Sequence, residues 1–348
     1  MIRTIDLFSG AGGLSLGLKQ AGFKAEAAIE IDRFAVATYA RHSPDVELIS
    51  SDVRRVNFRS FLNRVDVVVG GPPCQPFSSG GRRASRSDAR DMIPEYLRAL
   101  SEIRPIAFLM ENVPGLAVGD RRHYLNEVIE AMRRLGYVVA TRVLKAEEYG
   151  VPQKRRRLFV VGMLEGEFTF PDPTHGPGCG QPFVTVSDAL PKHPVGELNA
   201  AKVTYARNPD LRPSPFDGLL VNGGGRPIDV SKPSHTILAS AGGNKTHFFD
   251  PNGVLIEYHR YLQSGGSPRS GEVPGARRLT VTESALLQTF PRQVRFIGPK
   301  SAQYRLVGNA VPPKLGAVIG QHLARQLGHA PRQHRMRAVA AQQDGLFS

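Results

Sequence analysis

Strand-like and helix-like segments alternate through the first half of the chain. Short apolar runs lie at residues 2–8, 25–31, 65–69 and 106–110, and helix-like patterns fill residues 12–20, 33–41 and 93–103 between them. Alternation of this kind is typical of a mostly parallel sheet covered by helices on both faces. We therefore expect an α/β fold with a doubly wound, Rossmann-like sheet, in which ligands bind beyond the carboxyl ends of the strands.

The composition of the chain changes after about residue 165. From there to about residue 275 it is rich in Gly, Pro, Asn and Ser, with short β-like pieces at 182–186, 235–239 and 246–250. A capping-box pattern at Thr280 and Glu283 then predicts a helix to about residue 289, and Pro312 and Pro313 precede a helical run to Leu327. The expected organisation is a first domain at 1–170, a smaller loop-rich β domain at 171–278, a hinge helix and return to the first domain at 279–327, and a basic, disordered tail at 328–348.

The charge of the chain indicates a polyanionic partner. The sequence holds 45 Lys and Arg against 31 Asp and Glu, a formal net charge of +14, and residues 260–348 contain 13 basic and 3 acidic residues. Since there is no long apolar span or cationic amphipathic anchor, nucleic acid is favoured over a membrane surface.

The two cysteines, Cys74 and Cys179, are too few for a disulfide framework and lack zinc-site spacing. The N-terminus lacks the apolar core of a secretory signal. We expect a cytoplasmic protein without a metal.

Cys74 is a candidate nucleophile. It follows the apolar run at 65–69 in the segment Gly70-Gly71-Pro72-Pro73-Cys74-Gln75-Pro76, so the thiol leaves the end of a buried strand on a loop that prolines stiffen. The alternative interpretation is a small buried hydrophobic residue, which is the usual fate of a free cysteine.

A glycine-rich turn between the first strand and the first helix predicts a nucleotide-type cofactor site. Gly10, Gly12 and Gly13 let backbone N–H groups approach a ligand, and Glu30, 20 residues after Gly10, lies where a carboxylate accepts hydrogen bonds from ribose hydroxyls. The third spaced glycine of the pyrophosphate fingerprint is missing, which favours S-adenosylmethionine over NAD. Asp52 either takes the adenine amino group or caps a turn.

Five blocks in order resemble the DNA (cytosine-5) methyltransferases. They are Asp6-Leu7-Phe8-Ser9-Gly10-Ala11-Gly12-Gly13, Gly71-Pro72-Pro73-Cys74-Gln75-Pro76-Phe77-Ser78, Glu111-Asn112-Val113, Gln153-Lys154-Arg155-Arg156-Arg157 and Gly308-Asn309-Ala310-Val311-Pro312-Pro313. The resemblance covers about residues 4–327, and the size is similar to that of bacterial modification enzymes. It implies that the variable stretch after the arginine cluster is a target-recognition domain.

The resemblance also implies the chemistry. A thiolate at Cys74 adds to carbon 6 of cytosine and makes carbon 5 nucleophilic towards a sulfonium methyl group. Glu111 hydrogen-bonds at N3 and holds the exocyclic amino group, Arg157 contacts O2 of the base, and Arg155 lies near the nucleophile. Because a free thiol has a pKa of about 8.5, positive surroundings are expected around Cys74.

The cofactor implied is S-adenosyl-L-methionine, with S-adenosyl-L-homocysteine as product. By resemblance, Phe8 stacks near the adenine, Glu30 binds the ribose, Asp52 and Val53 contact the adenine edge, and Met92 closes over the ligand. The remaining residues that we expect to line this site are Ser9, Gly10, Gly12, Gly13, Ile31, Pro72, Asn309 and Ala310.

The expected macromolecular substrate is double-stranded DNA whose target nucleotide is flipped out of the helix. The Gly/Ser-rich, basic segment at 80–87 suits a loop that closes on DNA, with a plain surface loop as the alternative. The expected DNA-binding residues are Gln75, Ser78, Gly80, Arg82 and Arg83 near the nucleophile, and Thr236, Asn244 and Lys245 in the second domain. His235 and His247 are expected to be loop or core histidines. We expect a monomer that works in a restriction-modification system beside an independent endonuclease.

Three alternative functions remain open from the sequence. An RNA (tRNA) cytosine-5 methyltransferase of the same fold shares the blocks, but its Cys-Phe-Thr signature is absent here. A zinc cytidine deaminase requires a second cysteine close to the first, and Cys74 has none. A non-catalytic DNA-binding module would not need Cys74 and Glu111 at strand ends.

Overall fold

The chain forms two compact units in a computed structural model that describes residues 1–74, 90–239 and 243–329. Unit 1 contains Met1–Lys145, Arg156–Asp172 and Pro313–Ser348, and unit 2 contains Ala146–Arg155 and Pro173–Pro312. Unit 2 thus extends to Pro312, so the chain returns to unit 1 later than the expected boundary near residue 279. The short segment 146–155 also belongs to unit 2, although the sequence suggested no interruption there.

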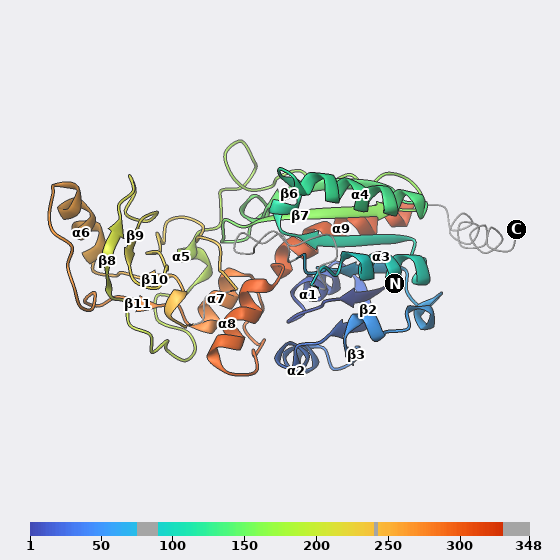
Figure 1. Ribbon diagram of the computed structural model, residues 1–348, viewed down its shortest axis with the longest axis horizontal. Coiled ribbons are helices and arrows are strands. Elements are labelled where there is room, and N and C mark those ends of the chain that lie inside the picture. The colour runs from blue at the N-terminus through green and yellow to red at the C-terminus, as the bar shows by residue number, and fades with distance from the viewer. Residues whose placement is uncertain (75–89, 240–242, 330–348) are drawn as a thin grey trace, which may run out of the picture. The chain divides into compact units, whose positions relative to one another are not determined.

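Unit 1 is built around a seven-stranded sheet in the order β3-β2-β1-β4-β5-β7-β6 (Figure 1). The strands are β1 Ile2–Leu7, β2 Phe23–Glu30, β3 Glu47–Ser50, β4 Val67–Gly70, β5 Ala107–Asn112, β6 Val138–Lys145 and β7 Arg156–Met163. The first five run parallel, and β7 runs antiparallel to both β5 and β6. The mostly parallel α/β sheet expected from the alternating pattern is confirmed.

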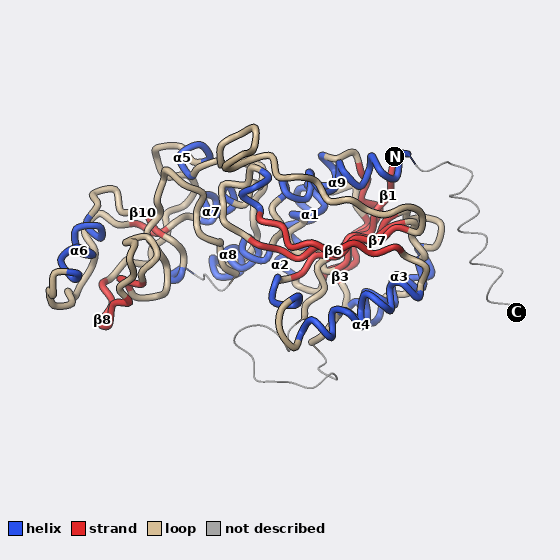
Figure 2. Tube along the Cα trace, turned by 90° about the horizontal axis from the view of Figure 1, so that it is seen from above, coloured by secondary structure: helices blue, strands red, loops and turns tan. Residues whose placement is uncertain are grey.

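Helices cover both faces of this sheet (Figure 2). Unit 1 contains α1 Gly13–Gln20, α2 Arg33–His42, α3 Ile93–Ile103, α4 Arg121–Arg134 and α9 Pro313–His329. Figure 2 shows α1 and α9 on one face and α3 and α4 on the other. Strand β4 and residues 107–110 of β5 are therefore buried on both sides, and their apolar side chains are 0% exposed. Continuous Val and aliphatic runs are what such doubly covered strands require.

Helix α9 approaches α1 through small residues. A Cβ added at Gly17 would lie 2.3 Å from the carbonyl oxygen of Pro313 and 2.7 Å from the amide nitrogen of Ala317. Only glycine fits at this contact, because the obstructing atoms belong to backbone that cannot rotate away. The C-terminal helix is thereby packed on the first helix of the chain.

Unit 2 is richer in loops. It contains two two-stranded ribbons, β8 Tyr205–Asp210 with β9 Leu219–Val221 and β10 Phe248–Phe249 with β11 Arg277–Arg278, and the helices α5 Val186–Ala189, α6 Val254–Gln263, α7 Val281–Leu287 and α8 Lys300–Asn309. Its own apolar core includes Val203, Leu220, Phe248, Leu255 and Tyr258. The capping box predicted at the start of α7 is confirmed, since Thr280 and Glu283 exchange side-chain to backbone hydrogen bonds.

The β-like pieces expected in unit 2 are only partly strands. Residues 182–185 are irregular, because Thr185 caps α5 through Asp188. Residues 235–238 are also irregular, and Gln153 accepts the Ile237 amide through its side chain in place of a neighbouring strand. Within 246–250, only β10 pairs with another strand.

Candidate active site

Cys74 and Glu111 come from neighbouring parallel strands of unit 1. Strand β4 pairs with β5 with Gly70 opposite Met110, so the loop after β4 and the end of β5 meet at one edge of the sheet. Cys74 is 8% exposed and Glu111 9% exposed. A Cβ on Gly71 would lie 3.0 Å from Oε2 of Glu111, which explains the glycine at this position. The carboxylate therefore lies against the loop that carries the cysteine.

Asn112 ties this loop to β5. Its Nδ2 donates to the carbonyl oxygen of Pro72 at 3.0 Å, and its Oδ1 accepts from the amide of Val113 at 2.9 Å. Asn112 is part of the third sequence block but was not proposed as a site residue. Its contacts identify it as a residue that fixes the backbone two positions before Cys74.

Glu111 and Arg157 form an ion pair. Nε of Arg157 lies 2.7 Å from Oε1 of Glu111, and the side chains are 15% and 11% exposed. The antiparallel pairing of β5 with β7 places Glu111 opposite Phe159, two residues from Arg157. An ion pair between a guanidinium and a shielded carboxylate restricts the orientation of both groups. Two of the four predicted catalytic residues are thus in direct contact.

The electrostatics at Cys74 differ from the expected positive surroundings. Burial, together with the negative charge of Asp91, raises the pKa of the Cys74 thiol to about 12, while Arg121 on α4 opposes this shift. Arg121 and Asp91 carried no motif in the sequence, so neither was proposed. A thiol with such a pKa is protonated at neutral pH, and it requires a change in its surroundings to become a nucleophile.

The glycine-rich turn has the backbone geometry of a ligand cradle. Gly10 and Gly12 adopt φ values of +53° and +78°, and Phe8 adopts +59°, a region that non-glycine residues seldom enter. The hydroxyl of Ser9 is buried and has no hydrogen-bond partner within the described residues. An unsatisfied buried hydroxyl beside a turn held in the left-handed region fits a polar ligand.

Glu30 closes this turn. Its Oε2 accepts the Gly10 amide at 2.8 Å, and its Oε1 accepts the amides of Ile31 and Asp32, each at 2.8 Å. A carboxylate offers about four acceptor positions, so capacity remains for a ribose hydroxyl. Ile31 is 67% exposed beside it, an unusual exposure for an aliphatic side chain that suits contact with a flat apolar ring.

Asp52 forms the turn cap that was the alternative to an adenine contact. Its Oδ1 accepts the Arg54 amide at 3.0 Å at the start of a short 3₁₀ turn, and Arg54 also pairs with it through its guanidinium. These hydrogen bonds lower the pKa of Asp52 to about 2. Val53, the next residue, is buried. The amide of Met92 donates to the carbonyl of Pro73 at 2.9 Å. The adenine contacts expected of Asp52 and Val53, and the closure of Met92 over the ligand, stay predictions.

Arg155 belongs to unit 2 and is 1% exposed. Its guanidinium donates to the carbonyl oxygens of Ile237 at 3.2 Å, Gly308 at 2.8 Å and Ala310 at 3.0 Å. The predicted cofactor residues Asn309 and Ala310 follow directly after Gly308, at the end of α8. Arg155 therefore organises loops of unit 2, and its expected role beside the nucleophile stays a prediction.

The three recognition residues expected in unit 2 differ in their surroundings. Asn244 and Lys245 are exposed on the short turn Gly243–Lys245, whereas the hydroxyl of Thr236 donates to the carbonyl of Lys154 at 2.5 Å. Gln75, Ser78, Gly80, Arg82 and Arg83 lie outside the described residues, as does the segment 330–348. His247 is a core histidine that contacts Thr236 and Arg226, as expected.

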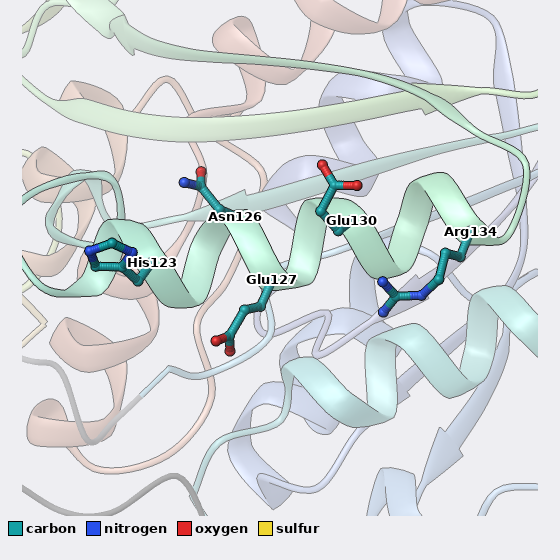
Figure 3. Close-up of a pocket in the computed structure, with 5 residues that line it drawn as sticks. All are labelled: His123, Asn126, Glu127, Glu130 and Arg134. Carbon is teal, nitrogen blue, oxygen red and sulfur yellow. The ribbon is translucent and has the colours of Figure 1, made fainter.

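A surface groove of about 380 Å³ runs along α4 (Figure 3). Five exposed polar residues of that helix line it, namely His123, Asn126, Glu127, Glu130 and Arg134. None of the predicted site residues lines this groove.

Among residues 1–74, 90–239 and 243–329, no group of three or more His, Cys, Asp and Glu side chains is arranged to hold a metal ion. Within the same ranges, no helix is both long and apolar enough for a transmembrane span.

Comparison with known proteins identifies the family. The model of the C-5 cytosine-specific DNA methylases matches residues 2–213 and 219–325. The chain is 34% identical to the Type II methyltransferase M.PspPI of Psychrobacter sp., over 94% of this chain and 80% of that protein. It is 35% identical to the Type II methyltransferase M1.HphI of Haemophilus parahaemolyticus, over 91% of this chain and 85% of that one.

Solved structures show the same fold. A DNMT2 variant from Spodoptera frugiperda superposes with a TM-score of 0.69 at 20% identity, covering 93% of this chain and 100% of that one. The sequence blocks, the sheet order and the family match agree with one another. The chain belongs to the C-5 cytosine-specific DNA methylase family, and it is an enzyme of this class.

Proposed function

We propose that this protein transfers a methyl group from S-adenosylmethionine to carbon 5 of a flipped-out cytosine in a specific duplex DNA sequence, through a covalent Cys74 adduct. The observation that carries the proposal is the convergence of Cys74, Glu111 and Arg157 at one edge of the sheet, with the carboxylate held 2.7 Å from the guanidinium. This set supplies a nucleophile, a group for N3 and a cation for O2 of one pyrimidine.

The proposed reaction proceeds in three steps. The Cys74 sulfur, as thiolate, bonds to carbon 6 while electron density moves to N3, where the carboxyl of Glu111 in its protonated form donates a hydrogen bond to the nitrogen. Carbon 5 would then bond to the methyl carbon as the carbon–sulfur bond of the sulfonium breaks and S-adenosylhomocysteine leaves. Loss of the carbon 5 proton to a base expels the sulfur from carbon 6 and restores the aromatic ring. Arg157 keeps Glu111 in place and contacts O2 of the base.

The residues of the glycine-rich turn are proposed to hold the methyl donor. When bound, S-adenosylmethionine supplies an electrophilic methyl group on a sulfonium centre. Glu30 would accept ribose hydroxyls, and Ser9 would satisfy its buried hydroxyl on the ligand. Further contacts are proposed for Ile31, Asp52, Val53 and Met92, and the roles of Asn309 and Ala310 rest on the sequence block alone.

The biological role proposed is the protective half of a restriction-modification system, acting as a monomer on double-stranded DNA in the bacterial cytoplasm. Support comes from two relatives named Type II methyltransferases, both from bacteria. The formal net charge of +14 suits a DNA substrate. Unit 2 is proposed to read the sequence, with Asn244 and Lys245 on an exposed turn.

The covalent step is tested with duplexes that carry 5-fluorocytosine. Fluorine on carbon 5 cannot leave as a proton does, so an adduct that resists denaturant accumulates on the wild-type protein with its methyl donor. The Cys74→Ser variant gives none. Equal turnover by that variant, or no adduct on duplexes bearing the methylated motif, contradicts the proposal.

The substrate is tested in cells and in vitro. Bisulfite sequencing of DNA from expressing cells should show one methylated motif, and its absence contradicts the assignment. Purified protein should methylate duplex DNA, whereas preferential methylation of tRNA would support the RNA-directed alternative.

A further inference from the structure

Cys74 is attached to the start of α3 by backbone contacts. Cys74 and Asp91 form an isolated antiparallel bridge, and the neighbouring Met92 amide donates to the Pro73 carbonyl at 2.9 Å. The segment that carries the sulfur is therefore paired with the residues immediately before α3. Any group that fixes Asp91 also fixes Cys74.

The side chain of Asp91 is held at both carboxylate oxygens. Its Oδ1 accepts the amide of Ile93 at 3.1 Å, which satisfies a donor in the first turn of α3. Its Oδ2 accepts a hydrogen bond from the hydroxyl of Tyr124 on α4. Asp91 thus links three parts of the fold: its backbone bridges to Cys74, and its carboxylate binds α3 and α4.

The same carboxylate acts on the sulfur electrostatically. Among the described residues, the charged and titratable groups that act on Cys74 are Asp91 before α3, and Arg121 and Tyr124 on α4. Burial and Asp91 raise the pKa of the thiol, and Arg121 lowers it. Because negative charge near a thiol disfavours the thiolate, Asp91 adds to the effect of burial on the pKa of Cys74.

We propose that Asp91 and Tyr124 are positioning residues for Cys74, which pin the nucleophile segment to α3 and keep its sulfur in the thiol form while no DNA is bound. The inference rests on the proposed role of Cys74 as nucleophile. It assigns a function to two side chains that lie outside the five sequence blocks. A protected thiol avoids oxidation and alkylation between turnovers, since the thiolate is the reactive form.

The test is the rate at which iodoacetamide alkylates Cys74 in the DNA-free protein, followed by peptide mass spectrometry between pH 7.5 and 9.5. Asp91→Asn removes the charge but keeps one acceptor, since its Oδ1 can still accept from the Ile93 amide while its Nδ2 faces the Tyr124 hydroxyl as a donor. A pKa lower by about one unit should speed alkylation at fixed pH about three- to fivefold, because reduced nucleophilicity offsets part of the gain in thiolate. Glu130→Gln on α4 is the matched control, in which Cys74 should be alkylated at the wild-type rate. Alkylation of Cys179 in the same sample is the internal reference.

The pinning role is tested separately with Tyr124→Phe, which keeps the Asp91 charge and removes the hydroxyl. Hydrogen exchange at the amides of Met92 and Ile93 should become at least about fivefold faster, while the thermal unfolding midpoint of the protein changes little. Unchanged exchange in Tyr124→Phe, or unchanged alkylation in Asp91→Asn, overturns the proposal.

Alkylation requires neither DNA nor the methyl donor. Failure of this proposal is therefore distinguishable from failure of the proposed function, which the 5-fluorocytosine adduct of the wild-type protein tests.

Discussion

Glu111 shows how a single residue combines burial, charge and position. It lies at the end of β5, is 9% exposed, and is paired with Arg157. Substitution with glutamine keeps its volume but removes the group that stabilises charge at N3. We expect Glu111→Gln to lower kcat by about 10²- to 10⁴-fold with little change in the Kd for duplex DNA. Single-turnover methylation and filter binding measure the two quantities, and Glu130→Gln is the exposed control. A parallel loss of DNA affinity would contradict this role.

Asp6 gives a prediction for stability at the residue scale. It is 1% exposed beneath the glycine-rich turn and accepts a hydrogen bond from Ser15 at 2.6 Å. Burial raises its pKa from 3.8 to about 7. Between pH 4 and pH 7, about the two pKa values, Asp6 of the folded state keeps a proton that the unfolded state has lost. The free energy of unfolding should therefore fall as pH rises from about 4 to 7.

Asp6→Asn should remove this contribution, which is at most about 4 kcal/mol. The measurement is the difference in urea unfolding between the variant and the wild type at pH 4.5 and pH 7.5. The variant should gain stability relative to the wild type at the higher pH. If the unfolding free energies of variant and wild type differ by the same amount at both values of pH, the pKa of Asp6 is not raised and the prediction is wrong.

At the scale of elements, the contact between α1 and α9 depends on Gly17. Its Cβ position lies 2.3 Å from the backbone of Pro313, so Gly17→Ala must push the two helices apart. We expect a loss of about 1–3 kcal/mol in unfolding free energy. Gly328→Ala, in the last turn of the same helix α9, adds a methyl group where no atom lies within 4 Å and is the matched control. It should be neutral or stabilise by up to about 1 kcal/mol.

Elements marked by a run of apolar residues or by a helix cap were predictable from the sequence. Elements that exist only through pairing with a distant segment were not. The apolar run of β4 and the capping box of α7 appear where expected. Strand β8 was missed, because its residues Tyr205–Asp210 include Pro209 and lack alternation, and pairing with β9 defines it. The segment at 235–238 lacks a strand partner because a side chain of Gln153 takes its amide.

The candidate site follows the same division. Motifs identified Cys74, Glu111 and Arg157. The parallel pairing of β4 with β5 brings the Cys74 loop to the end of β5, and the antiparallel pairing of β5 with β7 places Arg157 beside Glu111. Asp91, Arg121 and Tyr124 were not found, because they act through tertiary proximity and belong to no block. The cap formed by Asp52 was one of two alternatives that the sequence left open.

At the scale of the whole molecule, the recognition role proposed for unit 2 can be separated from general affinity for DNA. Lys245→Ala should weaken binding to all duplexes alike and reduce the slope of log K against log salt by about one. Asn244→Ala should instead reduce discrimination. The difference in binding free energy between the cognate site and a site with one mismatched base pair should fall by about 1–3 kcal/mol. Both side chains are exposed on one turn, so neither change should affect the fold. Titrations at several salt concentrations distinguish the two effects.

The packing of α9 on α1 also bears on how the protein is made. The helix at Gly13–Gln20 leaves the ribosome early, but its neighbour Pro313–His329 is synthesised roughly 300 residues later. At 5–20 residues per second, that interval lasts on the order of 15 to 60 seconds. During it, the apolar surface of the nascent first helix has no permanent cover. Maturation of unit 1 must therefore await synthesis of residues 313–329, and chaperone binding to early nascent chains is the expected consequence.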